Sequence, residues 1–574
     1  MPARAELTLA ALGLIHHCSP GALRDLARAR GITPDESWSV YALATALIEP
    51  GAVWHQLSRL DRDSLVAVER LRHDPGSSHL PMRWGIADTE VGALRPEVIH
   101  AIETFSSEWT TALTSPVPAD SAVHTVDERT DALTQSLPRI VDALDTLGLA
   151  ICLVAHNDIT QRTPSSAGLA KALGQIAPDV SADWVVAAEW GAWSGFLIHQ
   201  AGSWWVSDEA LRFVVTDRAT QLATLVQRWW ESADEAVREQ LHRLVTEGPA
   251  AASVVDQIVT RLPLLDSSLL SAFFERGHSL GAFSANRPTA LVRHLISGDD
   301  VEKVVGPLMP PPAPGVYLDG VDSVVGAGPL TQEHRDSLTL VARCVRGGMT
   351  PRWVIDRERV LASLTATSSG GLCERLGKVI IGGVPDSLRH QIVHWESRAQ
   401  SVTLSPSFPD THIHCADNYL SELLLVDQKL QTLHLARVDD TTLASKRDPG
   451  QTRHVLLDAG YPTFPSDVTP HSPRVLTATA TPPLPESWWT AIIADAKDMP
   501  TNAVWTEDVL HDAIAERTLL SLTVRVGDHE RVMVVEPRSI AGGRLRVKDT
   551  AADVERTLPL DTILSMVPAQ RSVT

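Results

Sequence analysis

Apolar residues recur at helical spacing through the first part of the chain, and short turns separate one run from the next. Ser19 and Pro20 supply an N-cap and a proline at the first helical position, which predicts a helix from there to Gly31. Further amphipathic runs of similar length follow. The pattern predicts a helical domain over residues 1–114 and then a linker with little periodicity over residues 115–127.

The pattern changes in the region 128–308. After a helix, the apolar run Leu149–Val154 is expected to be a strand. Next, a helix over residues 184–192 leads into two short apolar segments joined by a turn, and another helix begins at Ser207 or the residue after it. The order helix, short strand, turn and strand is typical of a winged helix. A weaker run of the same kind covers residues 265–297.

The proline-rich sequence 309–314 marks a domain boundary, because proline interrupts both helices and sheet ladders. After it, short strand-like segments alternate with amphipathic helices up to residue 465. This alternation predicts an α+β domain over residues 309–465. A second break, rich in proline, threonine and serine, covers residues 466–486 and is expected to be a linker.

The tail, residues 487–574, combines a helix with strands. The helix is expected to begin near Thr506, where Thr-Glu-Asp places carboxylates at its positive end. Apolar and polar residues then alternate in short segments separated by turns such as Gly542-Gly543. This pattern predicts a small, strongly bent antiparallel sheet or barrel. The chain is therefore expected to be a multi-domain α+β protein with a mainly helical N-terminal half.

Charge and composition restrict the partners. The chain of 574 residues has a formal net charge of −20, so its overall field does not steer it to DNA. Its five cysteines include no CxxC pair, which argues against a disulfide framework and fits a reducing compartment. The start lacks a signal-peptide pattern, and no apolar run approaches the ~20 residues of a membrane span. We expect a cytoplasmic protein without a membrane partner.

Compact catalytic motifs are missing from the sequence. A helicase motor needs a GxxxxGK[ST] loop to hold phosphates, but the glycine pairs Gly347-Gly348, Gly370-Gly371 and Gly382-Gly383 lack the following lysine and hydroxyl. The single Gly-Lys, at Lys378, is followed by valine. There is also no GxSxG, HExxH or GxGxxG motif. The sequence predicts neither an enzyme nor a bound cofactor.

The nearest approach to a metal cluster is His412, His414 and Cys415. In a strand, His412 and His414 project from the same face, where two imidazoles can share one ion. No third ligand follows from the local spacing, so we favour histidines in an ordinary strand and predict no metal site.

One local basic patch stands out in this acidic chain. Arg544, Arg546 and Lys548 alternate along one predicted strand and so share a face, while Arg525 and Arg538 lie on neighbouring segments. Such a face can contact nucleic-acid phosphates. An ordinary solvated sheet face is the favoured alternative, and these five residues are kept as candidate nucleic-acid-binding residues.

Diffuse patterns in the second half resemble a known family. The segments 310–364, 384–388, 416–425 and 456–461, together with His394 and Trp395, resemble the XPB-type helicase N-terminal domain of actinobacterial helicase-associated proteins. Upstream, residues 194–197 and 229–230 are similar to the winged-helix part of that family. The resemblance implies docking with a helicase or work on DNA.

The tail resembles a WYL-like module, the ligand-sensing domain of many bacterial regulators. The residues that carry this resemblance lie at positions 513–514, 535–537, 542–545 and 556–563. The Trp-Tyr-Leu signature itself is absent, and Thr562 stands where such modules usually carry an arginine. These two departures weaken the implication of ligand sensing.

Three functions are compatible with these observations. The favoured one is a non-catalytic adaptor that docks an XPB-type helicase, DNA, or both, in DNA repair or transcription. The alternative is a winged-helix/WYL-type transcriptional regulator that responds to a ligand, which needs a basic recognition helix that the sequence does not provide. The third is an enzyme whose converging carboxylates and histidine become visible only in three dimensions.

Overall fold

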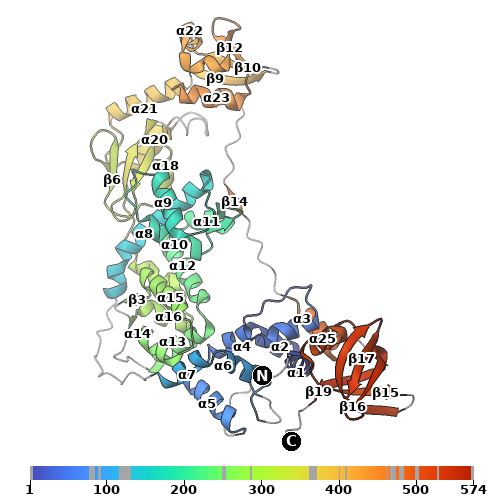
Figure 1. Cartoon of the computed structure of the whole chain (residues 1–574). Coiled ribbons are helices and arrows are strands. Elements are labelled where there is room, and N and C mark those ends of the chain that lie inside the picture. Colours follow the sequence, from blue (N-terminus) through green and yellow to red (C-terminus); the bar gives the residue numbers. More distant parts are fainter. Residues whose placement is uncertain are drawn as a thin grey trace. The chain divides into compact units, whose positions relative to one another are not determined.

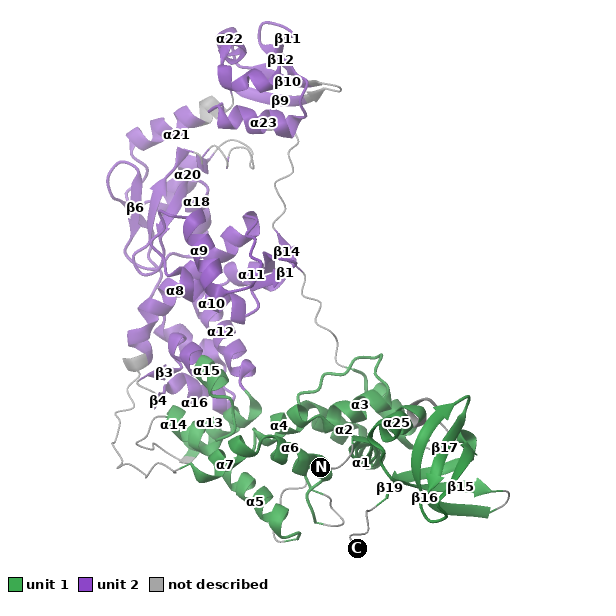
Figure 2. Ribbon diagram, in the orientation of Figure 1, with its two compact units in different colours: residues 1–126, 234–273, 480–574 green, residues 127–233, 274–479 purple. Residues whose placement is uncertain are grey.

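The structure is a computed structural model that describes residues 4–76, 85–87, 92–115, 131–247, 254–284, 287–357, 359–360, 363, 371–399, 401–407, 410–461, 463–465, 474–476, 484–497, 503–526 and 529–569. It is an α+β protein with several small, mostly antiparallel sheets, as the sequence predicts (Figure 1). The chain divides into two compact units, each built from separate stretches of sequence (Figure 2).

The first unit contains residues 1–126, 234–273 and 480–574. Its N-terminal helices are α1 (Arg4–His17), α2 (Pro20–Ala29), α3 (Val40–Ile48), α4 (Pro50–Leu57), α5 (Arg62–His73), α6 (Pro96–Thr104) and α7 (Ser106–Thr114). Two further helices are α13 (Glu235–Glu247) and α14 (Val254–Arg261). The predicted start of α2 is confirmed, because the Ser19 hydroxyl accepts a hydrogen bond from the Ala22 amide at 3.2 Å.

The tail of the chain completes this unit. It supplies α24 (Glu486–Lys497), α25 (Ala503–Glu516), and the strands β15 (Leu520–Val526), β16 (His529–Ala541), β17 (Arg544–Asp549), β18 (Val554–Pro559) and β19 (Ile563–Pro568). The strands form one antiparallel sheet in the order β18-β17-β16-β15-β19, so the last strand returns to pair with the first. The predicted small antiparallel sheet is confirmed, and the helix expected near Thr506 is α25, which begins three residues earlier at Ala503.

One hydrophobic core joins the two ends of the described chain. Buried residues of α1, α2 and α3 belong to the same cluster as those of α24, α25 and the inner face of the tail sheet. Leu12, Leu43, Leu510 and Leu545 are all fully buried members of it. The predicted domains 1–114 and 487–574 therefore share a core. The division of the chain into five ranges, made from the sequence, stays a prediction.

A buried ion pair ties the N-terminal helices together. Arg30 and Glu97 lie 3.5 Å apart with side chains that are not exposed at all. The Arg30 guanidinium also donates to the Gln56 side chain at 3.0 Å and to the Leu47 carbonyl at 2.5 Å. Burial lowers the pKa of Arg30, and these acceptors compensate part of the cost of placing its charge in the interior.

The second unit contains residues 127–233 and 274–479. It begins with α8 (Asp131–His156), α9 (Ser166–Ile176), α10 (Trp184–Trp193), the hairpin β1 (Leu197–Gln200) and β2 (Ser203–Ser207), α11 (Asp208–Val214) and α12 (Arg218–Ser232). Thr160 forms an additional bridge to Ser203. The predicted helix-hairpin order of a winged helix is thus present, and α11 begins at Asp208, the second of the two expected positions, with Ser207 as its cap.

The predicted strand Leu149–Val154 is wrong, because this run is the last part of α8. Leu147, Ala150, Ile151 and Val154 are fully buried, at the i, i+3, i+4 and i+7 spacing of one helix face. Cys152 is exposed between them. An unbroken apolar run does not distinguish a buried strand from a buried helix segment, and packing decides here.

A helix–hairpin–helix run also exists in the weaker predicted segment. It consists of α15 (Ser267–Ser279), the two-residue strands β3 (Phe283–Ser284) and β4 (Arg287–Pro288), and α16 (Ala290–Ser297). The short helix α17 (Val301–Val305) and the 3₁₀ turn η2 (Gly306–Leu308) then lead to the proline-rich boundary.

The range 309–465 contains two separate hydrophobic cores. The first, over residues 313–392, surrounds a sheet of order β5-β6-β8-β7. Its elements are β5 (Val316–Leu318), β6 (Ser323–Gly326), α18 (Gln332–Thr339), β7 (Ala342–Arg346), β8 (Arg352–Ile355), α20 (Leu372–Val379) and α21 (Asp386–Ala399).

The second core, over residues 402–456, belongs to a sheet of order β11-β12-β10-β9-β13. Its elements are β9 (Val402–Ser407), β10 (Asp410–Cys415), α22 (Asn418–Val426), the 3₁₀ helix η3 (Gln428–Leu433), β11 (Ala436–Arg437), β12 (Thr442–Ser445), α23 (Pro449–Asp458) and β13 (Phe464–Pro465). The strand β11 is only two residues long, and η3 ends three residues before it.

Candidate protein and nucleic-acid interfaces

The basic face predicted on the tail lies on β17. Arg544 and Arg546 are exposed and Lys548 is half-buried, whereas Leu545 and Val547 between them are fully buried in the core. The predicted alternation is therefore confirmed, and the three cations project from the outer side of the sheet.

Carboxylates neutralise much of this face. Arg546 forms an ion pair with Glu555 of β18, and Lys548 Nζ lies 2.6 Å from Asp553 Oδ1. The register also places Lys548 between Glu536 and Glu555 of the adjacent strands. Two of the three cations are thus already paired within the sheet, which reduces their attraction for phosphate groups.

The remaining candidate residues do not all join this face. Arg538 lies on the adjacent strand β16 and pairs with Glu536 at 3.0 Å. Arg525 lies opposite Glu530 near the other end of β16, about 20 Å along the strand from Glu536. The structure thus brings four of the five predicted residues onto adjacent strands and separates Arg525 from them.

The winged-helix element carries the opposite charge. Its helix α10 and its hairpin contain no lysine or arginine. Asp183, which caps α10, and Val185 and Glu189 on that helix are exposed. In DNA-reading winged helices this helix lies against the duplex, so a surface without cations is poorly suited to that role.

A strand from the predicted linker covers one edge of the hairpin. β14 (Val475–Leu476) pairs in parallel with β2, so the sheet order is β1-β2-β14. The Arg474 guanidinium lies 4.4 Å from the centre of the Trp205 ring and forms an ion pair with Asp158. Residues 466–473 and 477–483 of the predicted linker lie outside the part of the chain that the structure describes.

The tryptophans of this region pack in the interior. Trp184, Trp190, Trp204 and Trp229 are buried, and Trp193, Trp205 and Trp230 are partly buried. Trp190 donates from its indole nitrogen to the Ser279 hydroxyl at 3.0 Å. These side chains therefore serve core packing and form no exposed aromatic patch.

His412 and His414 do share one face of β10, with ring centres 6.2 Å apart. The His414 ring nitrogens lie within hydrogen-bond distance of the Ser405 and Thr442 hydroxyls. Across the described ranges, no group of three or more histidine, cysteine or carboxylate side chains is placed to hold a metal ion. The His414 imidazole takes part in the hydrogen bonding of the sheet.

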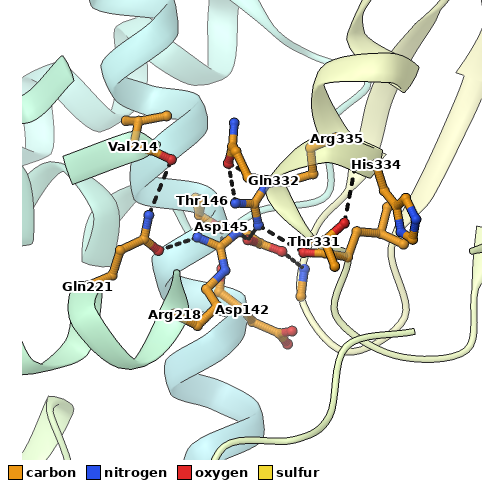
Figure 3. Close-up of polar contacts among 12 residues, drawn as sticks. Asp142, Asp145, Thr146, Val214, Arg218, Gln221, Thr331, Gln332, His334 and Arg335 are labelled. Atoms are coloured by element: carbon orange, nitrogen blue, oxygen red, sulfur yellow. Dashed lines mark hydrogen bonds and ion pairs between the residues drawn. The ribbon is translucent and has the colours of Figure 1, made fainter. Parts of the chain in front are cut away.

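A buried charge cluster lies between the winged-helix element and the sheet of the 313–392 core (Figure 3). Arg218 of α12 forms an ion pair with Asp145 of α8, and Arg335 of α18 reaches the same carboxylate at 3.3 Å. The side chains of all three are at most 16% exposed. Figure 3 shows the two guanidinium groups meeting at Asp145. Burial lowers the pKa of Arg335 to about 10, so it stays charged at neutral pH.

The turn between β7 and β8 closes this cluster. The Gly348 amide donates to Asp145 at 2.6 Å and the Met349 amide donates to Asp142 at 2.9 Å. Gly348 has a φ of +80°, and a Cβ there would lie 1.5 Å from an Asp142 carboxylate oxygen. The pair Gly347-Gly348 therefore allows the backbone to approach the carboxylates of α8 closely. In the sequence, the same pair lacks the lysine of a phosphate-binding loop.

Sequence reasoning did not identify this cluster. Asp145 and Arg335 are 190 positions apart, and Arg218 is far from both. The only local signal is the glycine pair, which is also common in ordinary turns. The arrangement fixes two parts of the second unit against each other.

Comparison of the sequence with protein-family models and with curated proteins gives no match. In the part of the chain that the structure describes, every helix is too short or too polar to cross a bilayer.

Proposed function

We propose that this chain is a non-catalytic adaptor that docks a protein partner, an XPB-type DNA helicase, in DNA repair or transcription. The absence of lysine and arginine from α10 and the winged-helix hairpin carries this proposal. A DNA-reading helix needs cations or amides toward the duplex. Exposed carboxylates beside the apolar Val185 suit a protein surface better.

The charge distribution elsewhere supports the same role. The chain has a formal net charge of −20, and the cations Arg538, Arg546 and Lys548 of the tail sheet are paired with carboxylates. Helicases that track along DNA need basic surfaces, and such a surface is electrostatically complementary to an acidic adaptor.

The adaptor would depend on its partner for chemistry, because its own sequence lacks a phosphate-binding loop. We place its action in the cytoplasm. All five cysteines are free thiols, and a reducing compartment keeps thiols in that state.

Two binding measurements test the proposal. The purified chain is titrated with duplex, forked and single-stranded DNA at increasing salt, and separately mixed with a purified XPB-type helicase and analysed by size-exclusion chromatography. We expect co-elution with the helicase and no salt-sensitive retention of DNA.

Co-elution without DNA binding supports the adaptor. Salt-sensitive DNA binding that is lost in the triple variant Arg544→Glu, Arg546→Glu, Lys548→Glu would favour direct DNA handling and the regulator alternative. Failure to co-elute with the helicase under conditions where both proteins are folded would refute the proposed partner.

A further inference from the structure

The helix α22 has two apolar faces, only one of which is buried. Ser421 and Leu424 face the core of its small domain. On the opposite side, Tyr419 is 77% exposed, Leu423 is 39% exposed and Val426 is 72% exposed. Their i, i+4 and i+7 spacing aligns them in one stripe along the helix. Three large apolar side chains in a continuous exposed stripe differ from the scattered exposed residues of ordinary surfaces.

Carboxylates lie on both sides of this stripe. At about 100° per residue, Glu422 is on one side of the Tyr419–Val426 line and Asp427, just after the helix, is on the other. Glu422 forms an ion pair with Arg437 of β11. Hydrogen bonds from the Lys429 amide and the Tyr461 hydroxyl lower the pKa of Asp427, so this carboxylate is negatively charged at neutral pH.

The turn between β11 and β12 extends the same surface. The Ser421 hydroxyl donates to the Asp440 carbonyl at 2.7 Å, which holds this turn beside α22. The turn exposes Val438 (53%) and the side chains of Asp439 and Asp440. Hydrogen bonds from the Thr441 amide and the Thr442 side chain lower the pKa of Asp439.

The surface is therefore both apolar and acidic. Residues 416–440 contain five carboxylates, at positions 417, 422, 427, 439 and 440, and two cations, Lys429 and Arg437. Arg437 is already paired with Glu422. The charge that remains is negative, and it surrounds the apolar stripe.

We propose that the exposed stripe of α22 and the β11–β12 turn form a docking surface for a basic amphipathic helix of a protein partner. The stripe binds the apolar face of that helix, and the surrounding carboxylates pair with its lysines or arginines. α22 has nine residues, about 13 Å of helix, which matches two to three turns of the partner. The inference rests on the proposed adaptor role. It names the surface that binds the partner and the kind of helix that the partner contributes.

The test uses the full chain and two synthetic helical peptides with identical leucine positions, one carrying lysines and the other glutamates. Binding is measured by fluorescence anisotropy of the labelled peptides. We expect the lysine peptide to bind and the glutamate peptide not to bind. The triple variant Tyr419→Ser, Leu423→Ser, Val426→Ser should weaken binding at least tenfold, and Asp439→Asn with Asp440→Asn should reduce its salt dependence.

A matched control removes three scattered, exposed apolar side chains, Val215, Leu269 and Val321, which are 63%, 62% and 75% exposed. Serine at these positions should leave binding unchanged. An equal loss in both triple variants would show generic adhesion to an acidic protein and would overturn the proposal. The single variant Tyr419→Ser tests the same surface with a smaller change, in case the triple variant does not fold. In the wild-type chain, the lysine peptide should slow hydrogen exchange of residues 418–441.

The outcomes separate this inference from the proposed function. If the lysine peptide protects α22 but the chain does not bind an XPB-type helicase, the docking surface stands and the helicase is the wrong partner. If the chain binds the helicase equally well with and without Tyr419→Ser, and the peptide does not protect α22, the adaptor role stands and the surface is wrong.

Discussion

The Tyr41 hydroxyl of α3 donates a hydrogen bond to the Asp512 carboxylate of α25 at 2.7 Å, across 471 positions of sequence. This bond joins an N-terminal helix to a C-terminal one within the core that they share. Burial, followed by the hydrogen bond to Asp512, raises the pKa of Tyr41 to about 12.

Replacing Tyr41→Phe should destabilise the first unit by about 1–2 kcal/mol, because the bond to a charged acceptor is lost. The folded pKa lies above the ordinary value of 10. The contribution of the tyrosine is therefore fully present below pH 10 and is lost as the pH rises toward 12. The stability of the first unit should differ between variant and wild type at neutral pH, and the difference should shrink as the pH rises from 10 toward 12. Tyr317→Phe, on a half-exposed side chain, is the control.

Replacing Asp145→Asn should destabilise the packing of α8 against α12 and α18 by about 3–5 kcal/mol. The amide keeps an acceptor for Gly348 but leaves the charges of Arg218 and Arg335 without a counter-ion. Faster hydrogen exchange in all three helices is the expected result. Glu333→Gln removes an exposed carboxylate from the same helix α18 and should have little effect. Equal exchange in the two variants would contradict the role assigned to Asp145.

Replacing Gly348→Ala should disrupt the same cluster through the backbone. A φ of +80° costs a residue with a side chain about 1–2 kcal/mol, and the added Cβ also meets the Asp142 carboxylate. Gly320→Ala, with a φ of +88° and no atom within 4 Å of the added Cβ, isolates the conformational cost. Thermal unfolding should show a larger loss for Gly348→Ala than for Gly320→Ala, and a similar loss would exclude a special contact at position 348.

Freeing the cations of the tail sheet should create DNA binding that we do not expect of the wild-type chain. The double variant Asp553→Asn, Glu555→Gln leaves Arg546 and Lys548 without their ion-pair partners. Retention of duplex DNA at low salt should rise. The fall of the binding constant with rising salt should correspond to the release of roughly two counter-ions. Asp63→Asn with Glu103→Gln changes the net charge equally at exposed positions elsewhere. If both variants retain DNA alike, the local face is not responsible.

Local patterns predicted much of the secondary structure. The predicted N-cap Ser19 accepts a hydrogen bond from the amide three residues later, and Ser207 does the same at the start of the helix expected there. The alternation around Arg546 is likewise set by neighbouring positions. Such signals need no knowledge of distant partners, which explains why they succeed.

Features that depend on distant packing were not predicted. The run Leu149–Val154 is apolar throughout, so only the tertiary surroundings of α8 decide between helix and strand. The Asp145 cluster collects charges from three distant stretches, and each residue alone reads as an ordinary surface charge. The exposed stripe of α22 was also hidden, because the sequence shows an amphipathic helix but not which apolar side chains remain uncovered.

The shared core of α1–α3 and the tail has a consequence for protein synthesis. About 440 residues separate the end of α3 from the start of α24. At ordinary translation speeds, the N-terminal helices wait roughly 20–90 s on the ribosome before the tail emerges. During that time Leu12, Leu43 and their neighbours lack the residues of α24, α25 and the tail sheet that belong to the same core. The nascent chain should therefore depend on chaperones, and premature termination before α24 should yield an aggregation-prone product.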